Sequence, residues 1–210
     1  MELRLSRAEY WLLETVVESK YPLYVVGVGS EDVDQFCLNK PSHGLPATRI
    51  IDTLARLFDR GWLVASQCKG DASRPLNRQE IDLAVVQPTS STAAVWYFGL
   101  TKAGGAVWEA FAAPNWDWFL DGRLGAEDAG EFIGASEEWL KRYFELVHYL
   151  GCRVRPGSEH WDEVRPWQAT YWKELPVGYR VRFECTWETP DMEVVPHQVM
   201  FLRDGWYRWR

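Results

Sequence analysis

Apolar and polar residues alternate most regularly in the last quarter of the chain, from Tyr179 to Glu188. Aromatic, aliphatic and cysteine side chains occupy every second position, and arginine, glutamate and threonine occupy the positions between them. A period of two predicts a strand with one buried face and one face in water. We expect Trp167–Trp172 to be its partner strand, and Asp204-Gly205 to form the two-residue turn of a final hairpin.

Helical spacing of apolar residues follows several recognisable helix starts. Ser6–Glu9 has the Ser-x-x-Glu form of a capping box, and Asn77–Glu80 has a related form. Pro46 suits the first turn of a helix that runs to Arg60, and Gly61 is a natural stop after it. Ser136 predicts the start of a further helix over 137–150.

The stretch from Val95 to Leu120 carries the densest pattern. Val95–Leu100 is an uninterrupted apolar run and predicts a buried strand, after which Thr101 caps a helix that Pro114 ends. Gly104 and Gly105 each cost such a helix on the order of 1 kcal/mol relative to alanine. We therefore expect a neighbouring backbone to lie close to this glycine pair.

Two shorter segments are less distinctive. Tyr24–Val28 is apolar but brief, so that a strand and a buried loop are both compatible with it. Ser30 precedes three acidic residues, which favours a short helix through Phe36 and Leu38.

The succession of elements from the first helix to Pro114 resembles a known family. The order of helix, short helix and amphipathic helix, followed by Arg60-Gly61-Trp62-Leu63-Val64, is similar to the core of a winged helix-turn-helix domain. The strand that ends in Leu100-Thr101-Lys102-Ala103-Gly104 resembles the second wing strand and following turn of MarR- and PadR-like regulators. The resemblance covers roughly residues 6–113, and it implies that the helix over 46–60 would enter the DNA major groove. The segment 66–94 departs from the pattern, because it holds a helix of its own where a plain wing has a short hairpin.

These patterns together predict an α+β fold. We expect a winged-helix-like domain over residues 1–125, packed on a smaller unit over 126–210 with one helix and three to four antiparallel strands. Gly122–Gly134, which is rich in glycine, alanine and acids, is the best candidate for the boundary.

Charge and composition narrow the possible partners. The formal net charge is −7 and both halves are mildly acidic, so neither half has an overall electrostatic footprint for nucleic acid or an anionic membrane. No apolar run reaches the roughly 20 residues of a membrane span, and Met1–Leu5 lacks the pattern of a signal peptide. We therefore expect a cytoplasmic protein that has no membrane partner.

Catalytic and metal-binding patterns are lacking in the sequence. The four cysteines are widely scattered without a Cys-x-x-Cys motif, so we expect them to be reduced and structural. His148 and Cys152 are four residues apart, but Gly151 breaks the helix that would align them as metal ligands. Neither a phosphate-binding loop nor a nucleophile motif is present. We expect no catalytic site, no metal site and no cofactor.

The outward face of the helix over 46–60 supplies the candidate contacts Arg49, Thr53, Arg56 and Arg60. In one interpretation the arginines bind phosphates or base edges of DNA. In the other, Asp52 pairs with Arg56 one helical turn later on a solvated face. We favour the second interpretation, because an acid in the middle of a DNA-reading surface is repelled by phosphate.

Tryptophan is abundant, with thirteen residues in the chain. Trp116 and Trp118 lie in a group of three aromatics that would form an exposed recognition patch or fill the junction between the two parts of the chain. We favour the junction.

Two function classes remain. The first is a non-enzymatic protein-interaction module, such as an adaptor, an inhibitor or an immunity-type factor. The alternative is a winged-helix transcriptional regulator whose C-terminal unit senses a ligand or dimerises.

Overall fold

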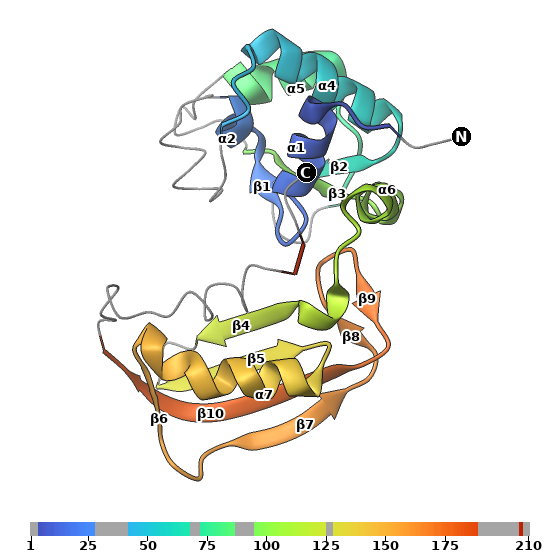
Figure 1. Ribbon diagram of the computed structural model, residues 1–210. Helices are drawn as coiled ribbons and strands as arrows, with labels where there is room; N and C mark the ends of the chain where they lie inside the picture. Colours follow the sequence, from blue (N-terminus) through green and yellow to red (C-terminus); the bar gives the residue numbers. More distant parts are fainter. Residues whose placement is uncertain are drawn as a thin grey trace. The chain divides into compact units, whose positions relative to one another are not determined.

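The computed structural model describes residues 4–27, 42–67, 72–86, 95–124, 128–188 and 206–207. The chain divides into two compact units (Figure 1). The first runs to Phe111 and also includes Thr170–Lys173, and the second comprises Ala112–Ala169 and the chain from Glu174 onward. We expected the division at 125/126. That point lies inside the second unit, between two strands that pair with each other. The predicted helix after Ser30 and the predicted hairpin at Asp204-Gly205 lie outside the described residues.

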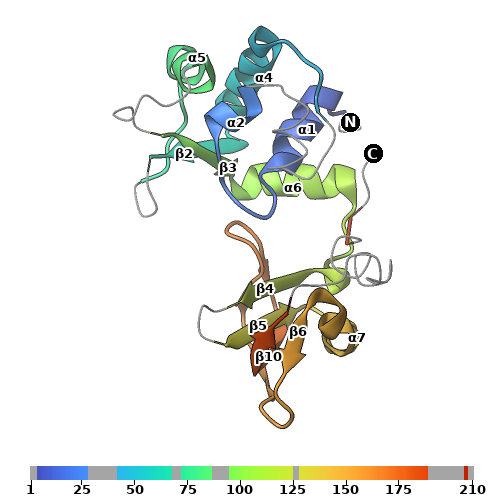
Figure 2. The ribbon, with the colours of Figure 1, turned by 90° about the vertical axis from the view of Figure 1, so that its left-hand side faces the viewer.

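The first unit has helices around a small antiparallel sheet. Its elements are α1 (Arg7–Thr15), β1 (Tyr21–Pro22), α2 (Leu23–Gly27), α4 (Ala47–Asp59), β2 (Leu63–Ser66), α5 (Arg78–Val86), β3 (Tyr97–Leu100) and α6 (Lys102–Ala112). The strands are ordered β1-β3-β2, so that the last strand in sequence lies between the other two. In Figure 2, α1, α2 and α4 lie together on one side of this sheet.

The predicted helix starts are confirmed where the structure describes them. Ser6 and Glu9 form the reciprocal capping box, with Ser6 N donating to Glu9 Oε2 over 2.9 Å. Asn77 and Glu80 exchange the same pair of bonds at the start of α5. Gly61 follows α4 with a φ of +68°, the left-handed conformation expected of a helix stop.

Of the segment Tyr24–Val28, the described residues Tyr24–Gly27 form neither the strand nor the loop that we expected, because Leu23–Gly27 is the short helix α2. Pairing with β3 ends at Pro22, and Leu23 N donates to Trp96 O before the chain turns into the helix. An apolar run of this length is compatible with either state, so periodicity alone did not decide between them.

Gly104 and Gly105 of α6 each lie close to a neighbouring group, as their cost in helix propensity led us to expect. A Cβ on Gly104 would lie 2.0 Å from the carbonyl oxygen of Trp62, which confirms the expected backbone contact. A Cβ on Gly105 would lie 2.0 Å from the ring of Trp172. Thr101 caps the helix as predicted, since its Oγ1 accepts from Gly104 N at 3.0 Å.

The second unit is one helix on an antiparallel sheet (Figure 1). Its elements are the 3-10 turn η1 (Trp116–Trp118), β4 (Leu120–Leu124), β5 (Ala129–Gly134), α7 (Glu137–Leu146), the 3-10 turn η2 (Val147–Leu150), β6 (Cys152–Val154), β7 (His160–Val164), β8 (Trp167–Gln168), β9 (Glu174–Leu175) and β10 (Gly178–Trp187). β10 pairs with β5, β6 and β7, while β8 and β9 form a separate hairpin. Helix α7 lies across the face on which Val181, Phe183 and Phe132 are buried.

The alternating strand near the carboxyl end is confirmed as β10, whereas its predicted partner is wrong. Trp167–Trp172 does not pair with β10: Trp167 pairs with Leu175, and Tyr171 and Trp172 belong to the first unit. Within 126–210 the main sheet has the four described strands β5, β6, β7 and β10; β4 adds a fifth from before the expected boundary, and the β8–β9 hairpin is additional. The segment 122–134, expected as the boundary, contains β5 and the end of β4. The sequence did not predict these strands, because their glycines and charges obscure the alternation.

Candidate functional site

Helix α4 carries the residues that the sequence nominated for DNA or partner contact. Ile50, Leu54 and Leu57 are fully buried, and Arg49 and Arg56 are exposed on the opposite side. Thr53, however, is also fully buried, and its hydroxyl donates to Arg49 O at 2.8 Å. Thr53 therefore faces the core of the unit, and the prediction that it contacts DNA or a partner at the surface is wrong.

Asp52 does not form the predicted ion pair with Arg56. The Asp52 carboxylate pairs with Arg78, the first residue of α5. Arg56 instead donates to the backbone carbonyl of Asp52 and to Thr53 Oγ1, both over 3.2 Å. The spacing rule for helices considers only one helix at a time. It therefore missed a partner that is supplied by a second helix.

Arg60 is held within the first unit by Glu9 and Trp62. Its guanidinium lies 2.9 Å from Glu9 Oε1 and 4.9 Å from the centre of the Trp62 ring. Burial by itself raises the pKa of Glu9, but the hydrogen bonds from Ser6 and the positive charges of Arg60 and Arg56 outweigh it, so that the pKa is lowered. Glu9 is thus a carboxylate, and it neutralises the last arginine of the candidate face.

Arg49 is the most available of the four nominated residues. It is exposed, and among the residues that the structure describes none pairs with its guanidinium. The basic face of α4 is therefore reduced to Arg49 and the partly engaged Arg56.

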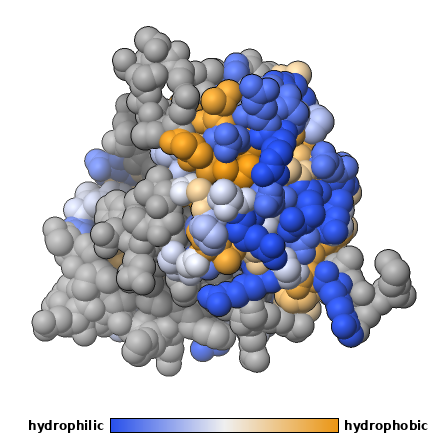
Figure 3. Space-filling model, turned by 90° about the horizontal axis from the view of Figure 1, so that it is seen from above, coloured by the Kyte–Doolittle hydropathy of each residue, from blue (hydrophilic) through white to orange (hydrophobic). Residues whose placement is uncertain are grey.

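Helix α5 (Arg78–Val86) packs beside both α2 and α4. Ile81 and Val85 are buried, and a Cβ on Gly27 would lie 2.4 Å from Val85. The opposite side of α5 exposes Leu83 (49%) and Val86 (57%). Leu83 and Val86 are three residues apart in sequence. They were not among the predicted site residues, although their position outside the Ile81–Val85 stripe was a signal that could have identified them. Figure 3 shows that hydrophobic residues are exposed next to strongly hydrophilic ones on the face that it displays.

Trp116 and Trp118 belong to the second unit and are half-buried there. Trp116 packs against Phe119 and against Trp206, with ring centres 5.4 and 4.9 Å apart. Trp118 stacks on Trp139 of α7 at 4.9 Å with the rings nearly parallel. The two residues therefore do not form an exposed patch, because both are engaged in packing within their own unit.

The solvent face of the second unit's sheet is charged but internally paired. Arg180 on β10 contacts Asp162 Oδ2 at 2.6 Å and Glu131 Oε2 at 3.6 Å, and Arg182 contacts Asp162 at 3.2 Å. The hydrogen bond from Arg180 and the nearby positive charges lower the pKa of Asp162 to about 2. This face alternates in sign and offers no single-sign field to a ligand.

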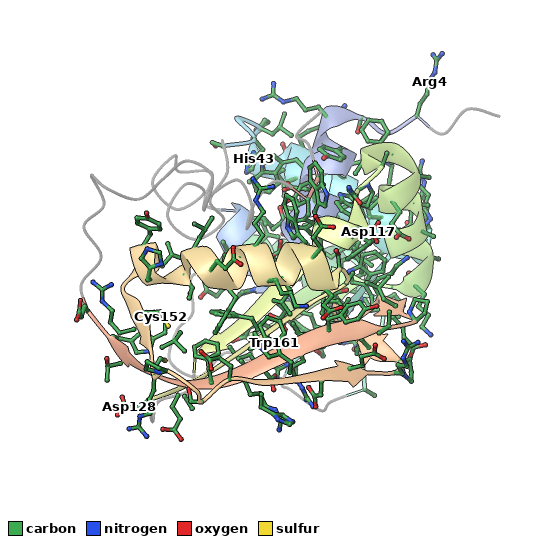
Figure 4. All side chains as sticks on the ribbon, turned by 60° about the horizontal axis from the view of Figure 1, so that its bottom comes forward. Arg4, His43, Asp117, Asp128, Cys152 and Trp161 are labelled. Atoms are coloured by element: carbon green, nitrogen blue, oxygen red, sulfur yellow. The ribbon has the colours of Figure 1, made fainter. Side chains whose placement is uncertain are left out.

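Cys152 and Cys185 are free thiols buried in the core of the second unit (Figure 4 labels Cys152). Burial and the hydrogen bond with Cys185 raise the pKa of Cys152 to about 12, which makes it a poor nucleophile. Cys37 and Cys68 lie outside the described residues. Within the described ranges, no three histidine, cysteine, aspartate or glutamate side chains come together as metal ligands would.

Trp161, also labelled in Figure 4, and Trp187 are large aromatics at the surface of this unit, and they are 37% and 41% exposed. The Trp161 ring meets Phe144 of α7 edge-on at 5.6 Å, and Lys141 lies 5.9 Å from its centre. Trp161 therefore covers the edge of the core beneath α7.

Comparisons of the chain with protein-family models, with curated proteins and with solved structures gave no match. Within the part of the chain that the structure describes, no helix combines the length and the apolar character needed to cross a bilayer.

Proposed function

We propose that this chain is a non-enzymatic protein-interaction module of the adaptor, inhibitor or immunity type, built on a winged-helix-like scaffold. The scaffold is supported by the element order α1-β1-α2-α4-β2-α5-β3, in which α5 is the addition to the winged-helix pattern, together with the sheet order β1-β3-β2. In this arrangement α4 corresponds to the helix that would enter the major groove in DNA-binding members.

The observation that carries the proposal is the ion pair between Arg78 of α5 and Asp52 of α4. It places the start of a second helix beside the exposed side of α4, where a duplex would have to approach. Arg60 is likewise committed to Glu9. A DNA partner would have to displace these contacts and would meet the Asp52 carboxylate, in a chain whose net charge is −7.

The outer side of α5 is the surface that we assign to a protein partner. Leu83 and Val86 are both about half exposed and lie on one side of a helix that is anchored by Ile81 and Val85. Apolar neighbours at i and i+3 on an anchored helix are suited to an apolar partner surface. Asp82, which is exposed next to Leu83 in the chain, would add a polar group beside such a contact.

The second candidate function is a winged-helix DNA-binding regulator, with the second unit as sensor or dimerisation element. The exposed guanidiniums of Arg49 and Arg56 on α4 favour it. Contacts of this kind would be phosphate contacts, whose strength falls steeply with added salt.

Two variants of the first unit, one on α5 and one on α4, distinguish the two functions. We expect Leu83→Asp to weaken binding of the captured and purified protein partner by at least about tenfold, equivalent to about 1.4 kcal/mol. Arg49→Ala, matched as an exposed residue of the neighbouring helix, should leave that binding unchanged. Circular dichroism of both variants controls for folding. The regulator is favoured instead if the full chain binds duplex DNA below micromolar concentration, with an affinity that falls with salt and with Arg49→Ala but not with Leu83→Asp.

A further inference from the structure

Four residues between β8 and β9, Thr170–Lys173, belong to the first unit although they lie far along the chain. They form a closed turn, in which Thr170 N donates to Lys173 O at 3.2 Å and Lys173 N donates to Thr170 Oγ1 at 3.1 Å. The backbone of this tip is thus ordered by the tip itself. The side chains of Tyr171, Trp172 and Lys173 contact groups of the first unit around them.

Tyr171 bonds to the first unit through its hydroxyl. Oη donates to Val16 O at 2.5 Å, just after α1, and accepts from Leu100 N at 2.6 Å, at the end of β3. Burial raises the pKa of Tyr171, so the hydroxyl remains a donor. A Cβ on Gly99 would lie 2.8 Å from Oη, which shows how closely the phenol approaches the β3 backbone.

Trp172 is 6% exposed and is held by a second, different set of groups. Its Nε1 donates to Val17 O at 2.8 Å. Its ring lies against the Cα of Gly105 on α6, where a Cβ would come within 2.0 Å of it, and it meets the ring of Trp108 edge-on at 6.3 Å. The glycine thus makes the space that the indole occupies.

Lys173 completes the set, with Nζ 2.6 Å from Glu109 Oε1 on α6. Both side chains are about a quarter exposed, so the pair is shielded more than a surface ion pair. Each of the three successive side chains therefore has its own kind of partner. The phenol hydrogen-bonds to one backbone carbonyl and one backbone N–H, the indole to a carbonyl beside the space left by a glycine, and the ammonium pairs with a carboxylate.

All of the recognising groups come from one small part of the first unit, where the end of α1, the end of β3 and the first turns of α6 meet. The carbonyls of Val16 and Val17 follow the last turn of α1, where backbone acceptors lack partners within the helix. This set of groups has the composition of a peptide-binding site: apolar walls with a few placed polar groups.

We propose that the first unit carries a binding site for a Tyr-Trp-Lys turn, filled here by the chain's own Thr170–Lys173, and that the same turn on a separate peptide binds there when the chain's own tip is removed. The ligand class is a tight turn with a phenol, an indole and a cation at successive positions. The inference is independent of the proposed partner surface on α5.

The test uses the full chain with Tyr171→Ser, Trp172→Gly and Lys173→Ser, and a cyclised, fluorescently labelled peptide of sequence QATYWKE, which reproduces 168–174. We expect saturable one-to-one binding and a raised melting temperature. Wild-type chain, whose site is occupied, should bind at least about tenfold more weakly. A peptide with alanine in place of its tryptophan should lose at least about 100-fold in affinity, and Glu109→Gln in the chain should weaken binding of the unaltered peptide.

The proposal is overturned if the folded triple variant does not bind the peptide up to millimolar concentration, or if the alanine-substituted peptide binds equally well. Should circular dichroism show the triple variant to be unfolded, the titration is made with Lys173→Ala, which keeps both rings of the tip. That variant should bind the peptide more tightly than wild type does, because its own tip lacks the ion pair. Equal binding by the two chains would then contradict the proposal.

Discussion

Gly104→Ala should destabilise the chain, although alanine is the better helix former. The position lies in the first turn of α6, where replacing glycine by alanine gains at most about 1 kcal/mol from helix propensity. The new Cβ would lie 2.0 Å from Trp62 O, a backbone atom that cannot rotate away. The start of α6 and the chain before β2 must therefore move apart.

The cost of that movement has two parts. Overpacking of this kind costs about 1–3 kcal/mol. Trp62 O also accepts from Thr101 N at 3.0 Å, and weakening that bond adds about 0.5–1.5 kcal/mol. After the propensity gain is subtracted, we expect a net loss of roughly 0.5–3.5 kcal/mol.

Urea unfolding followed by tryptophan fluorescence measures this loss. Ala106→Gly, at an exposed position of the same helix, is the matched control and should cost about 1 kcal/mol through propensity alone. If Gly104→Ala proves more stable than wild type while Ala106→Gly behaves as expected, the close approach of Trp62 O is not present in solution and the reasoning fails.

Three further predictions concern other elements. Trp108→Ala should cost about 3–5 kcal/mol, because the side chain is fully buried, and an unchanged melting temperature would contradict its placement. Ser6→Ala should cost about 1 kcal/mol by removing the capping box of α1, with Ser136→Ala as a comparison at the start of α7, and a loss below the measurement error at both positions would show that neither cap matters. Asp162→Asn should destabilise the chain near neutral pH, with an effect that fades as pH falls below 3.8 and is gone below about 2, because a lowered carboxyl pKa stabilises the fold only while the group is ionised; an effect independent of pH would refute the ion pair with Arg180.

Local signals in the sequence were sufficient to predict much of the fold. Ser6, Asn77 and Thr101 cap the helices that follow them because a cap needs only residues within one turn. The alternation that predicted β10 likewise depends only on residues within that strand. Helix α2 was missed because five apolar residues are too few to separate the two periods.

Features that depend on distant residues could not be predicted in this way. Gly130 in β5 disguises a strand, and the reason for it is the ring of Phe183, which would lie 2.4 Å from a Cβ there. The partner of Asp52 proved to be Arg78, which begins a different helix, α5. The place of Tyr171 beside Val16 had no signal in the sequence, since the two residues are 155 positions apart.

The central claim, that the α5 surface binds a protein, is tested most directly by a photo-crosslinking amino acid placed at position 83 of the full chain, in the cells that produce it. We predict a defined protein adduct, identified by mass spectrometry, that disappears when Val86→Asp is added to the same chain. The same crosslinker at position 49 serves as the comparison on α4. No protein adduct at position 83, together with a DNA adduct at position 49, would contradict the claim and favour the regulator.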